Sequence, residues 1–316
     1  MNGPSRREYQ VVVVGGGPAG LAAAAWLGRY RRRTLLVDAG EQRNRWTERV
    51  HGYLGSDPVA PGELLDRARR DLGAYTEVEQ HQGRVEGVTR LDEGFQVRIV
   101  EREVRADHLV LATGMTDELP QIDGFLEHYG ADAFHCVYCD GYETLGKRVV
   151  LLGWHQHVGE IAIQLLEWAA EVTVVTQGPE FQGATTSLRR RSVGIVRDEA
   201  VALLGPRGGL RGVRLRSGAT LDCNFLFFYF SRKPASELAR QLGCRLDADG
   251  MVITDEHGHT SVPGVFAAGD VTPGMQFVQM AAAKGAAAGM ACARFVRATA
   301  ARRRVQAAMA NARPDR

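Results

Sequence analysis

The chain has 316 residues, a length that fits about two domains of ordinary size. Hydrophobic residues make up 45% of it and charged residues 24%, the usual balance of a globular protein with sizeable cores. With 39 basic and 37 acidic residues the formal net charge is +2, which argues against binding nucleic acid through a general basic field.

The sequence contains no segment that we expect to enter a membrane or to direct secretion. The apolar run at residues 11–14 is too short for the core of a signal peptide. The alanine-rich stretch 281–293 includes Lys284 and is too short to cross a bilayer. We therefore expect a cytoplasmic protein that has neither a membrane nor a nucleic acid as a partner.

The first elements in chain order form a predicted β-α-β unit. Residues 11–14 are a continuous run of valine, which predicts a strand buried on both faces of a parallel sheet. A glycine-rich turn at 15–20 and a helix at 21–29 follow this strand. A second short strand at 34–37 ends directly before Asp38.

The middle of the chain predicts a hairpin and then a second β-α-β unit. Alternating residues at 96–110, after the turn at 92–94, favour antiparallel strands. The elements expected after them are strands at 108–112, 148–152, 172–175, 225–230 and 265–268, with helices at 158–170 and 280–297. The basic tail 300–316 is expected to be mobile, with at most a short helix at 305–309.

Two β-α-β units of similar pattern predict an α/β fold with two nucleotide-binding, Rossmann-like domains. The Gly269-Asp270 segment has no partner in its own neighbourhood, which indicates that the second domain is inserted into the first. We expect a split first domain at 1–118 and 247–316, with the second domain inserted at 119–246.

The string G-G-G-P-A-G, residues 15–20, contains the pattern G-x-G-x-x-G between a predicted strand and a predicted helix. Gly15 permits a tight turn, Gly17 lets the backbone approach a pyrophosphate, and Gly20 lets helix and strand pack closely. The helix N-terminus offers free N–H groups to the phosphates. Asp38 can accept hydrogen bonds from an adenosine ribose. The loop therefore indicates a dinucleotide, although by itself it does not separate FAD from NAD.

Two later segments favour FAD. The string V-F-A-A-G-D, residues 265–270, follows a predicted strand, and the carboxylate of Asp270 can hold the ribityl chain of a flavin. The structural alternative for Asp270 is the N-cap of the helix that follows. The string L-A-T-G, residues 111–114, is a third matching element.

The string H-C-V-Y-C-D-G, residues 135–141, places two of the five cysteines three positions apart. Such a pair closes a small disulfide with little rearrangement, and in a cytosolic chain it is usually redox-active or metal-binding. Zinc needs about four ligands, and His135, His155 and His157 would have to supply the others because no second Cys-x-x-Cys exists. We therefore expect a redox pair and no metal site, with zinc binding and chance spacing as the alternatives.

Thiolate chemistry at this pair needs a proton partner. Asp140 directly follows Cys139 and can protonate a leaving thiolate if burial raises the pKa of its carboxyl group. Its structural alternative is a turn residue before Gly141. The three other cysteines are widely spaced, which argues against a structural disulfide framework in a chain of this size.

The glycine loop, the Cys-x-x-Cys string and the V-F-A-A-G-D segment, in this order, resemble those of the low-molecular-weight thioredoxin reductases. The resemblance covers nearly the whole chain. The resemblance implies a homodimeric, FAD-dependent disulfide oxidoreductase whose partner is a thioredoxin-like protein or a small dithiol or disulfide. It assigns Cys139 to electron exchange with the flavin, Cys136 to exchange with the external disulfide, and Asp140 to the acid. The residues that we assign to FAD binding are Gly15, Gly17, Pro18, Ala19, Gly20, Asp38, Ala39, Val85, Ala112, Thr113, Gly114, Gly269, Asp270 and Gln279.

The inserted domain departs from this family where NADPH should bind. The family pattern is close to G-G-G-x-x-A/G, but residues 151–158 read L-L-G-W-H-Q-H-V. His155 stands where the backbone must approach the pyrophosphate, and Val158 stands where a small residue allows close helix packing. The family string H-R-R-x-x-x-R, which holds the 2′-phosphate, is replaced by the cation-free T-Q-G-P-E-F-Q at 176–182.

Two further features bear on this site. Arg189 to Arg191 come later and are candidates to replace the missing cations, while Ser231, after the aromatic run 225–230, replaces a family glycine. We expect NADPH binding to be poor or lost. The alternative is a divergent site that still binds NADH or NADPH weakly.

If NADPH is excluded, electrons have another source or another direction. The first hypothesis is a disulfide reductase supplied by another donor, such as ferredoxin or a flavodoxin-like protein. The second is a dithiol oxidase that passes electrons through the cysteine pair and FAD to oxygen. Relatives of that kind share an aromatic residue at Tyr138 and the string G-Y-E at 141–143, but they usually carry His where this chain has Asp140. Asp140 therefore favours the reductase, and a redox-silent FAD protein that binds a partner is the third hypothesis.

One histidine outside these motifs is a further candidate. His51 and Tyr53, in the string H-G-Y-L-G, fall in a region that packs near the flavin in this family. His51 is a candidate acid or base there. A structural histidine with satisfied hydrogen bonds is the alternative.

Overall fold

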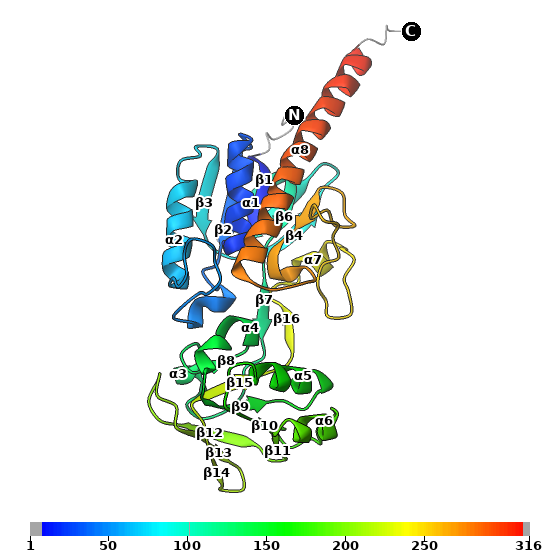
Figure 1. Ribbon diagram of the computed structural model, residues 1–316. Coiled ribbons are helices and arrows are strands. Elements are labelled where there is room, and N and C mark those ends of the chain that lie inside the picture. The colour runs from blue at the N-terminus through cyan, green and yellow to red at the C-terminus, as the bar shows by residue number, and fades with distance from the viewer. Residues whose placement is uncertain (1–7, 101, 312–316) are drawn as a thin grey trace. The chain divides into compact units, whose positions relative to one another are not determined.

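The computed structural model describes residues 8–100 and 102–311, with residues 302–311 as backbone alone. The chain divides into two compact units, each of which is described by itself. The first unit comprises Met1–Arg43, Gly62–Thr116 and Lys233–Arg316, and the second comprises Asn44–Pro61 and Asp117–Arg232. The bulk of the second unit is thus inserted along the chain within the first (Figure 1).

A seven-stranded sheet forms the centre of the first unit, with the order β3-β2-β1-β6-β5-β4 and with β17 paired to β6 beside this path. The pairs among β3, β2, β1, β6 and β17 are parallel, whereas β4, β5 and β6 are antiparallel. The strands are β1 Tyr9–Val14, β2 Thr34–Asp38, β3 Val78–Gln82, β4 Val85–Arg90, β5 Phe95–Ile99, β6 Arg102–Leu111 and β17 Val265–Ala267. The parallel pairing of β17 with β6 brings the two distant segments of the first unit into one sheet.

Alternate residues of β1 face two different cores. Val11 and Val13 pack with the helices α1 (Pro18–Arg29), α2 (Pro61–Leu72) and α8 (Val278–Asn311). Val12 and Val14 pack on the other face, with β4, β5 and the short helix α7 (Leu238–Gln241). Because both faces of this strand are covered, every residue in the run is apolar.

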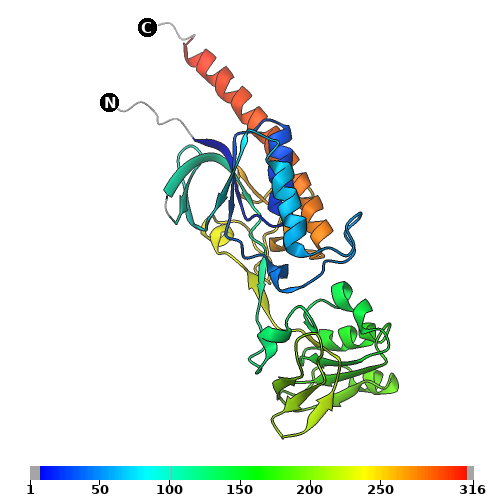
Figure 2. The same cartoon turned by 90° about the vertical axis from the view of Figure 1, so that its left-hand side faces the viewer.

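The helices α1 and α8 lie side by side (Figures 1 and 2), and glycine allows their close approach. A Cβ atom on Gly285 would lie 2.0 Å from the carbonyl oxygen of Ala19, and one on Gly289 would lie 2.6 Å from that of Ala23. Both glycines belong to α8 and stand about one turn apart. This contact fixes the N-terminal end of α1 against the segment that contains Gly269, whose Cβ would lie 2.7 Å from the Ala19 side chain.

The second unit contains a five-stranded parallel sheet and a three-stranded antiparallel sheet. The parallel order is β11-β10-β9-β15-β8, and the antiparallel order is β12-β13-β14. Helices α5 and α6 pack on one face of the parallel sheet, and the antiparallel sheet packs on the other. The elements are α3 Phe125–His128, β8 Ala133–Phe134, α4 Val137–Asp140, β9 Arg148–Leu152, α5 Gln156–Leu165, β10 Glu171–Val175, α6 Thr185–Arg190, β11 Gly194–Val196, β12 Ala200–Leu204, β13 Gly212–Leu215, β14 Thr220–Asp222 and β15 Phe225–Phe228.

The division between the units differs from the expected domain boundaries. Residues 233–246 belong to the first unit, because Leu238, Ala239 and Cys244 pack in its core. Residues 44–61 belong to the second unit, where the backbone of Trp46 passes so close to Gly130 that a Cβ there would lie 2.0 Å from the Trp46 carbonyl oxygen. The chain changes unit within the paired strands β7 (Met115–Asp117) and β16 (Arg232–Pro234).

Two helix ends also differ from expectation. Helix α8 continues to Asn311, so the expectation of a mobile tail from residue 300 is wrong over the described part of that tail. Alanine, arginine, glutamine and methionine all favour helix, which explains why it does not stop after Arg297. Residues 312–316 lie outside the described residues. Helix α5 ends at Leu165 and not at 170, because the Ala170 N–H already bonds to the carbonyl of Lys147.

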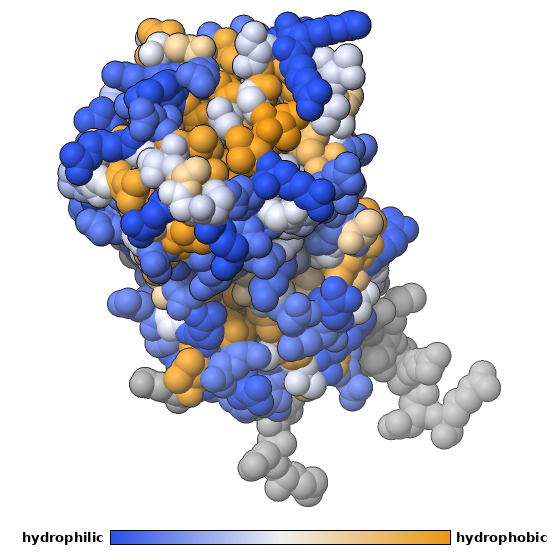
Figure 3. Space-filling view, turned by 90° about the horizontal axis from the view of Figure 1, so that it is seen from below, coloured by the Kyte–Doolittle hydropathy of each residue, from blue (hydrophilic) through white to orange (hydrophobic). Residues whose placement is uncertain are grey.

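The surface of the described residues is mixed in polarity. On the face shown in Figure 3, hydrophobic residues gather in one area and hydrophilic residues cover much of the remainder. Helix α8 is long, but it carries Lys284, Arg294 and Arg297. Among residues 8–100 and 102–311, no helix combines the length and the apolar character that a membrane span requires.

Gly285→Ala is expected to lower the free energy of unfolding by about 1–3 kcal/mol, because its Cβ would overlap the backbone of α1. The matched control is Gly62→Ala, at an exposed glycine with nothing within 4 Å of the added atom, which should change stability by less than about 0.5 kcal/mol. Urea denaturation of both variants measures the difference. Equal stability of the two would show that the α1–α8 contact does not depend on this glycine.

Candidate active site

The first glycine loop is built by close backbone contacts between β1, α1 and the end of β6. A Cβ on Gly15 would lie 2.2 Å from the carbonyl oxygen of Ala112, and Gly15 also has a φ of +107°, which L side chains rarely adopt. A Cβ on Gly20 would lie 1.7 Å from the carbonyl oxygen of Gly15. Gly16, which the sequence pattern treats as a variable position, also leaves no room, since its Cβ would meet the Asp38 side chain at 2.3 Å. The loop shape therefore excludes side chains at three successive contact points.

Gly17 differs from its neighbours because the space beside it is open. A Cβ there would meet only the Gln42 side chain, at 3.9 Å. Gly17 is the N-cap of α1, Pro18 occupies the first turn, and no side chain caps this helix end. The N–H groups of the first turn have no side-chain cap, and the space beside Gly17 is open, which fits the pyrophosphate of a dinucleotide.

Asp38 lies at the end of β2 and is already well supplied with hydrogen-bond donors. Its carboxylate accepts from the N–H of Gly16 at 3.2 Å, from that of Gly40 at 3.1 Å, and from the Gln42 amide at 3.0 Å. The Arg69 guanidinium pairs with it at 2.9 Å. A ribose hydroxyl would have to share or replace one of these donors, because a carboxylate offers about four acceptor sites. Gln42 and Arg69 have no motif around them, so nothing in the sequence marks their contact with Asp38.

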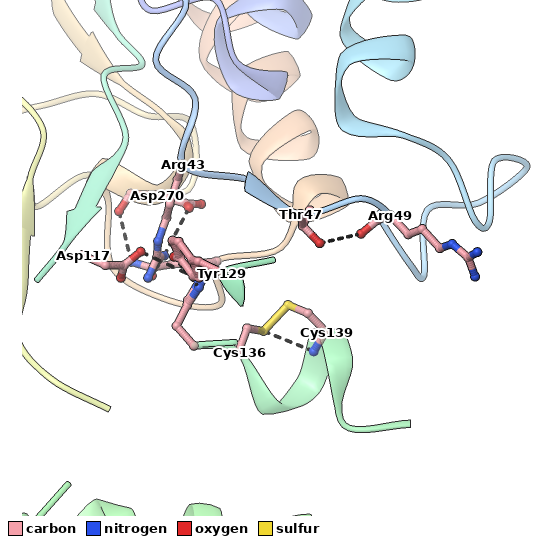
Figure 4. Close-up of a disulfide and its surroundings, with 10 residues drawn as sticks. Arg43, Thr47, Arg49, Asp117, Tyr129, Cys136, Cys139 and Asp270 are labelled. Carbon is pink, nitrogen blue, oxygen red and sulfur yellow. Dashed lines mark hydrogen bonds and ion pairs between the residues drawn. A yellow bond between two sulfur atoms is a disulfide. The ribbon is translucent and has the colours of Figure 1, made fainter. Parts of the chain in front are cut away.

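The second predicted FAD segment forms a turn beside the first. Gly269 has a φ of +80° and begins the short 3-10 turn Gly269–Val271. Asp270 therefore does not cap α8, which begins only at Val278. Its carboxylate lies 3.7 Å from the guanidinium of Arg43 (Figure 4). The same guanidinium donates to the Gln276 side chain at 2.7 Å. No sequence pattern marks Arg43 or Gln276, while the predicted Gln279 is exposed at the first turn of α8.

The remaining predicted FAD residues lie either close to the glycine loop or further from it. Thr113 follows Ala112 at the end of β6, and its backbone nitrogen would lie 3.3 Å from a Cβ on Gly15. Gly114 has a φ of +69° and open space beside it. Ala39 is exposed and directly follows Asp38. Val85 is the first residue of β4 and lies two residues after Gly83, whose N–H donates to the carbonyl of Asp38. The fold thus brings the predicted FAD residues near the N-terminus together with Gly269 and Asp270. Gln279 and Val85 lie at the edge of this group.

Cys136 and Cys139 form a disulfide in the second unit, with a Cα–Cα distance of 5.3 Å (Figure 4). The backbone N–H of Cys139 donates to the Sγ atom of Cys136 at 3.1 Å, at the start of α4. A donor aimed at this sulfur stabilises negative charge on it when the disulfide opens. The geometry therefore suits Cys136 as the sulfur that leaves or attacks during exchange.

Gly141 explains the last letter of the C-x-x-C-D-G string. A Cβ there would lie 2.4 Å from the carbonyl oxygen of Val137 and 2.5 Å from the ring of Trp168. The Trp168 ring thus packs directly on the turn that follows the disulfide. Tyr138, between the two cysteines, is 69% exposed and can meet a substrate from solvent.

Asp140 lies at the end of α4 and is largely shielded from water. Burial, and then the negative charge of Glu143, raise the pKa of Asp140 from 3.8 to about 7. A carboxyl group that titrates near neutral pH can both donate and accept a proton at the thiol pair. The sequence predicted such a group only on the condition that burial raises its pKa, and in the structure the Asp140 side chain is half-buried.

The other three cysteines are buried thiols. Burial raises the pKa of Cys223 to about 12, and it also raises the pKa values of Cys244 and Cys292. Thiols of this kind are inert, because the thiolate is the reactive form. In the part of the chain that the structure describes, no group of three or more His, Cys, Asp or Glu residues is placed to hold a metal ion.

The loop after β9 lies at the carboxyl edge of the parallel sheet in the second unit. Gly153 has a φ of +150°, and a Cβ there would lie 2.6 Å from the side chain of the buried Val158. The Trp154 ring lies tilted against His155 at 4.9 Å and against Phe230 at 5.7 Å between centroids. Arg189 to Arg191 are exposed on and after α6, whereas the Arg197 guanidinium donates to the carbonyl of Gly178, in the cation-free segment, at 3.2 Å.

Comparisons with known proteins place this architecture. Residues 9–285 match the family described as pyridine nucleotide-disulphide oxidoreductase. The chain belongs to this family. The thioredoxin reductase tcpT of Claviceps purpurea is 30% identical over 277 residues, which are 82% of this chain and 85% of that protein.

Solved structures agree with this assignment. The crystal structure of HlmI superposes with a TM-score of 0.92 and 34% identity, covering 99% of this chain and 100% of that one. The putative thioredoxin reductase TrxB from Bacillus anthracis superposes with a TM-score of 0.87 and 28% identity, covering 92% of this chain and 99% of that one. The protein is thus a thioredoxin reductase-like, FAD-dependent disulfide oxidoreductase with two Rossmann-like domains. When bound, FAD supplies a carrier for two electrons, and the glycine loop described above fits its pyrophosphate.

Gly17→Ala tests this cradle. The added methyl group meets open space in the protein itself, so the fold should persist, but it would occupy the place of a phosphate oxygen. We expect FAD binding at least about tenfold weaker, which corresponds to about 1.4 kcal/mol. The FAD-to-protein absorbance ratio and far-ultraviolet circular dichroism measure both properties. Wild-type FAD content in the variant would contradict the assignment.

Asp140→Asn tests the buried carboxyl group through the dependence of stability on pH. The folded-state pKa of about 7 lies above the usual 3.8, so the folded protein binds a proton that the unfolded chain releases between these values. This contribution to stability is full below about pH 4 and is lost as the pH rises through 7. The variant should therefore gain on the wild type from pH 5 to pH 8, by at most about 3 kcal/mol.

Denaturant titrations at several pH values measure this gain. Asp92→Asn, in the exposed hairpin turn, is the matched control and should follow the wild type at every pH. A constant difference between Asp140→Asn and the wild type from pH 5 to pH 8 would mean that Asp140 is not shifted.

Proposed function

We propose that the protein exchanges electrons between FAD and an external dithiol or disulfide through Cys136 and Cys139, and that NADPH drives it poorly or not at all. The observation that carries the proposal is the disulfide next to a carboxyl group of near-neutral pKa, Asp140. The pair can open and close, and Asp140 can carry the proton that each thiolate gains or loses. A thioredoxin-like protein or a small dithiol is the partner that this chemistry fits.

The second unit supports the exclusion of NADPH. A nucleotide on a parallel sheet binds outside the carboxyl ends of the strands, at the point where the strand order reverses. In this sheet β9 is that point, since β10 and β11 follow on one side and β15 on the other. Trp154 and Phe230 lie directly after β9 and β15 with their rings in contact, and Val158 fills the space beside Gly153. These side chains occupy the region that a pyrophosphate would need.

The missing charge argues in the same direction. The segment after β10 contains Phe181, whose ring packs over Gly159 in α5, and offers no cation of its own. The Arg197 guanidinium reaches this segment, but it bonds to the carbonyl of Gly178. A single guanidinium engaged in this way is a weak substitute for a bidentate clamp on a 2′-phosphate.

Electron balance then leaves two directions. If another protein, such as ferredoxin, reduces the FAD, the cysteine pair reduces an external disulfide. If an external dithiol reduces the Cys136–Cys139 disulfide, two electrons pass on to FAD and from there to oxygen, which becomes hydrogen peroxide. The covered nucleotide region is the observation that keeps the second direction open. If NADPH does not bind there, the electrons have to come from another source, and an external dithiol can supply them.

Anaerobic titration of the flavin absorbance separates these possibilities. We expect dithiothreitol to bleach the flavin of the purified holoprotein, whereas NADPH and NADH should bleach it at least about a hundredfold more slowly. Cys136→Ser and Cys139→Ser should abolish bleaching by the dithiol. Cys244→Ala, at a buried thiol away from the pair, should leave it unchanged.

Admission of oxygen after the dithiol titration decides the direction. Rapid return of the flavin absorbance with formation of hydrogen peroxide would favour the oxidase. Slow return would favour a reductase with a separate donor. Rapid bleaching by NADPH would contradict the proposed exclusion, and a dithiol that leaves the flavin oxidised would contradict the relay itself.

A further inference from the structure

The loop before α2 places a histidine, His51, next to Glu143, one of the two carboxyl groups that follow the disulfide in the chain. Val50 and Val59 exchange two backbone hydrogen bonds, of 2.7 and 3.2 Å, and so close the loop at its base. Within the loop, the Asp57 carboxylate accepts from the N–H of Gly52 at 2.8 Å and pairs with Nδ1 of His51 at 3.0 Å. These local contacts hold the His51 ring in one orientation.

The other side of the ring faces Glu143. The distance from Nε2 of His51 to Oε1 of Glu143 is 3.4 Å. The second oxygen of Glu143 is buried and has no hydrogen-bond partner among the residues that the structure describes. Glu143 lies three residues after Asp140, close enough for its charge to act on that carboxyl group. A histidine, two carboxyl groups and the thiol pair thus follow one another within the second unit.

Proton positions follow from these pairings. The Gly52 N–H, and then His51, hold the pKa of Asp57 below its usual value, so Asp57 stays ionised and accepts from Nδ1–H of His51. Nε2 of His51 then faces Oε1 of Glu143 at 3.4 Å, so a proton can pass between the carboxylate and the imidazole ring. The pair therefore offers a path for a proton next to Asp140.

We propose that Glu143, His51 and Asp57 form a proton relay that connects Asp140 with the surrounding water, with His51 as the residue that carries the proton out. This inference rests on the proposed function of the Cys136–Cys139 pair. The His51 side chain is 25% exposed, which gives it access to solvent, while Asp57 supports the positive charge that the ring gains.

The relay balances the redox step. Oxidation of the Cys136–Cys139 dithiol to the disulfide releases two electrons and two protons. Both electrons and one proton pass to FAD, so the second proton has to leave the pair. Asp140 accepts it from the thiol, Glu143 and then Nε2 of His51 accept it in turn, and water removes it. In the reverse direction the same groups deliver a proton to the leaving thiolate.

The test is the rate at which dithiothreitol reduces the flavin of the anaerobic holoprotein, followed by stopped-flow absorbance from pH 6 to pH 8. His51→Ala should slow reduction at least about tenfold, and added imidazole should restore much of the rate, because it replaces the missing proton carrier. A ring that only supports the loop would not give this rescue. His259→Ala is the matched control, since Nδ1 of His259 also pairs with an aspartate, Asp255, at 2.9 Å, and it should reduce at the wild-type rate.

A second variant covers the possibility that His51→Ala does not fold. Asp57→Asn keeps the loop shape but removes the charge that supports the imidazolium, and it should slow reduction about threefold or more, most strongly at low ionic strength. Reduction within twofold of wild type in both variants, while Cys136→Ser is inactive, would overturn the relay and leave the proposed function standing. Slow reduction that imidazole does not restore would also overturn it. A wild-type flavin that dithiothreitol does not reduce would overturn the proposed function itself.

Discussion

Two carboxyl groups, Asp140 and Glu143, share one poorly hydrated site next to the disulfide, and like charges at close range cannot both ionise without cost. Burial, and then this repulsion, raise the pKa of Asp140 to about 7. The surrounding structure maintains the site. The Trp168 ring packs on Gly141, directly after Asp140, and the loop that carries His51 places Nε2 of its ring 3.4 Å from Glu143. A short string in the sequence thus becomes a site in which thiol, acid and proton acceptor are arranged in series.

The first unit depends on another constraint, which is the close approach of backbones. Gly15 and Gly20 allow the loop to fold onto the end of β6, and Gly285 and Gly289 let α8 pack on α1. Together these contacts place the uncapped N-terminus of α1 at open space. The candidate FAD site is therefore formed mainly by close backbone contacts that only glycine permits, and much less by side chains that extend toward a ligand.

The sequence predicted the β-α-β units and the pair of cysteines that forms the disulfide, because each has a strong local pattern. The valine run of β1 and the Cys136–Cys139 spacing are examples. It did not predict the Arg43–Asp270 pair or the hydrogen bonds of Asp38, since these join residues far apart in the chain and no periodicity marks them. It placed the return of the chain to the first unit too late, at residue 247 instead of 233. The reason is that the short helix α7 joins that unit through a few apolar side chains, and the sequence does not show which core they enter. His51 was a candidate with an open role, and its Glu143 contact is what gives that role a direction.

The measurement that tests the shared carboxyl site most directly is a carbon-13 nuclear magnetic resonance titration of the Asp140 carboxyl group in the oxidised holoprotein, repeated with Glu143→Gln. We expect the Asp140 signal to titrate near pH 7 in the wild type and at a lower pH in the variant, because the variant loses the neighbouring negative charge. An Asp140 signal that titrates near pH 4 in both proteins would contradict the proposal that this carboxyl group exchanges protons with the cysteine pair at neutral pH.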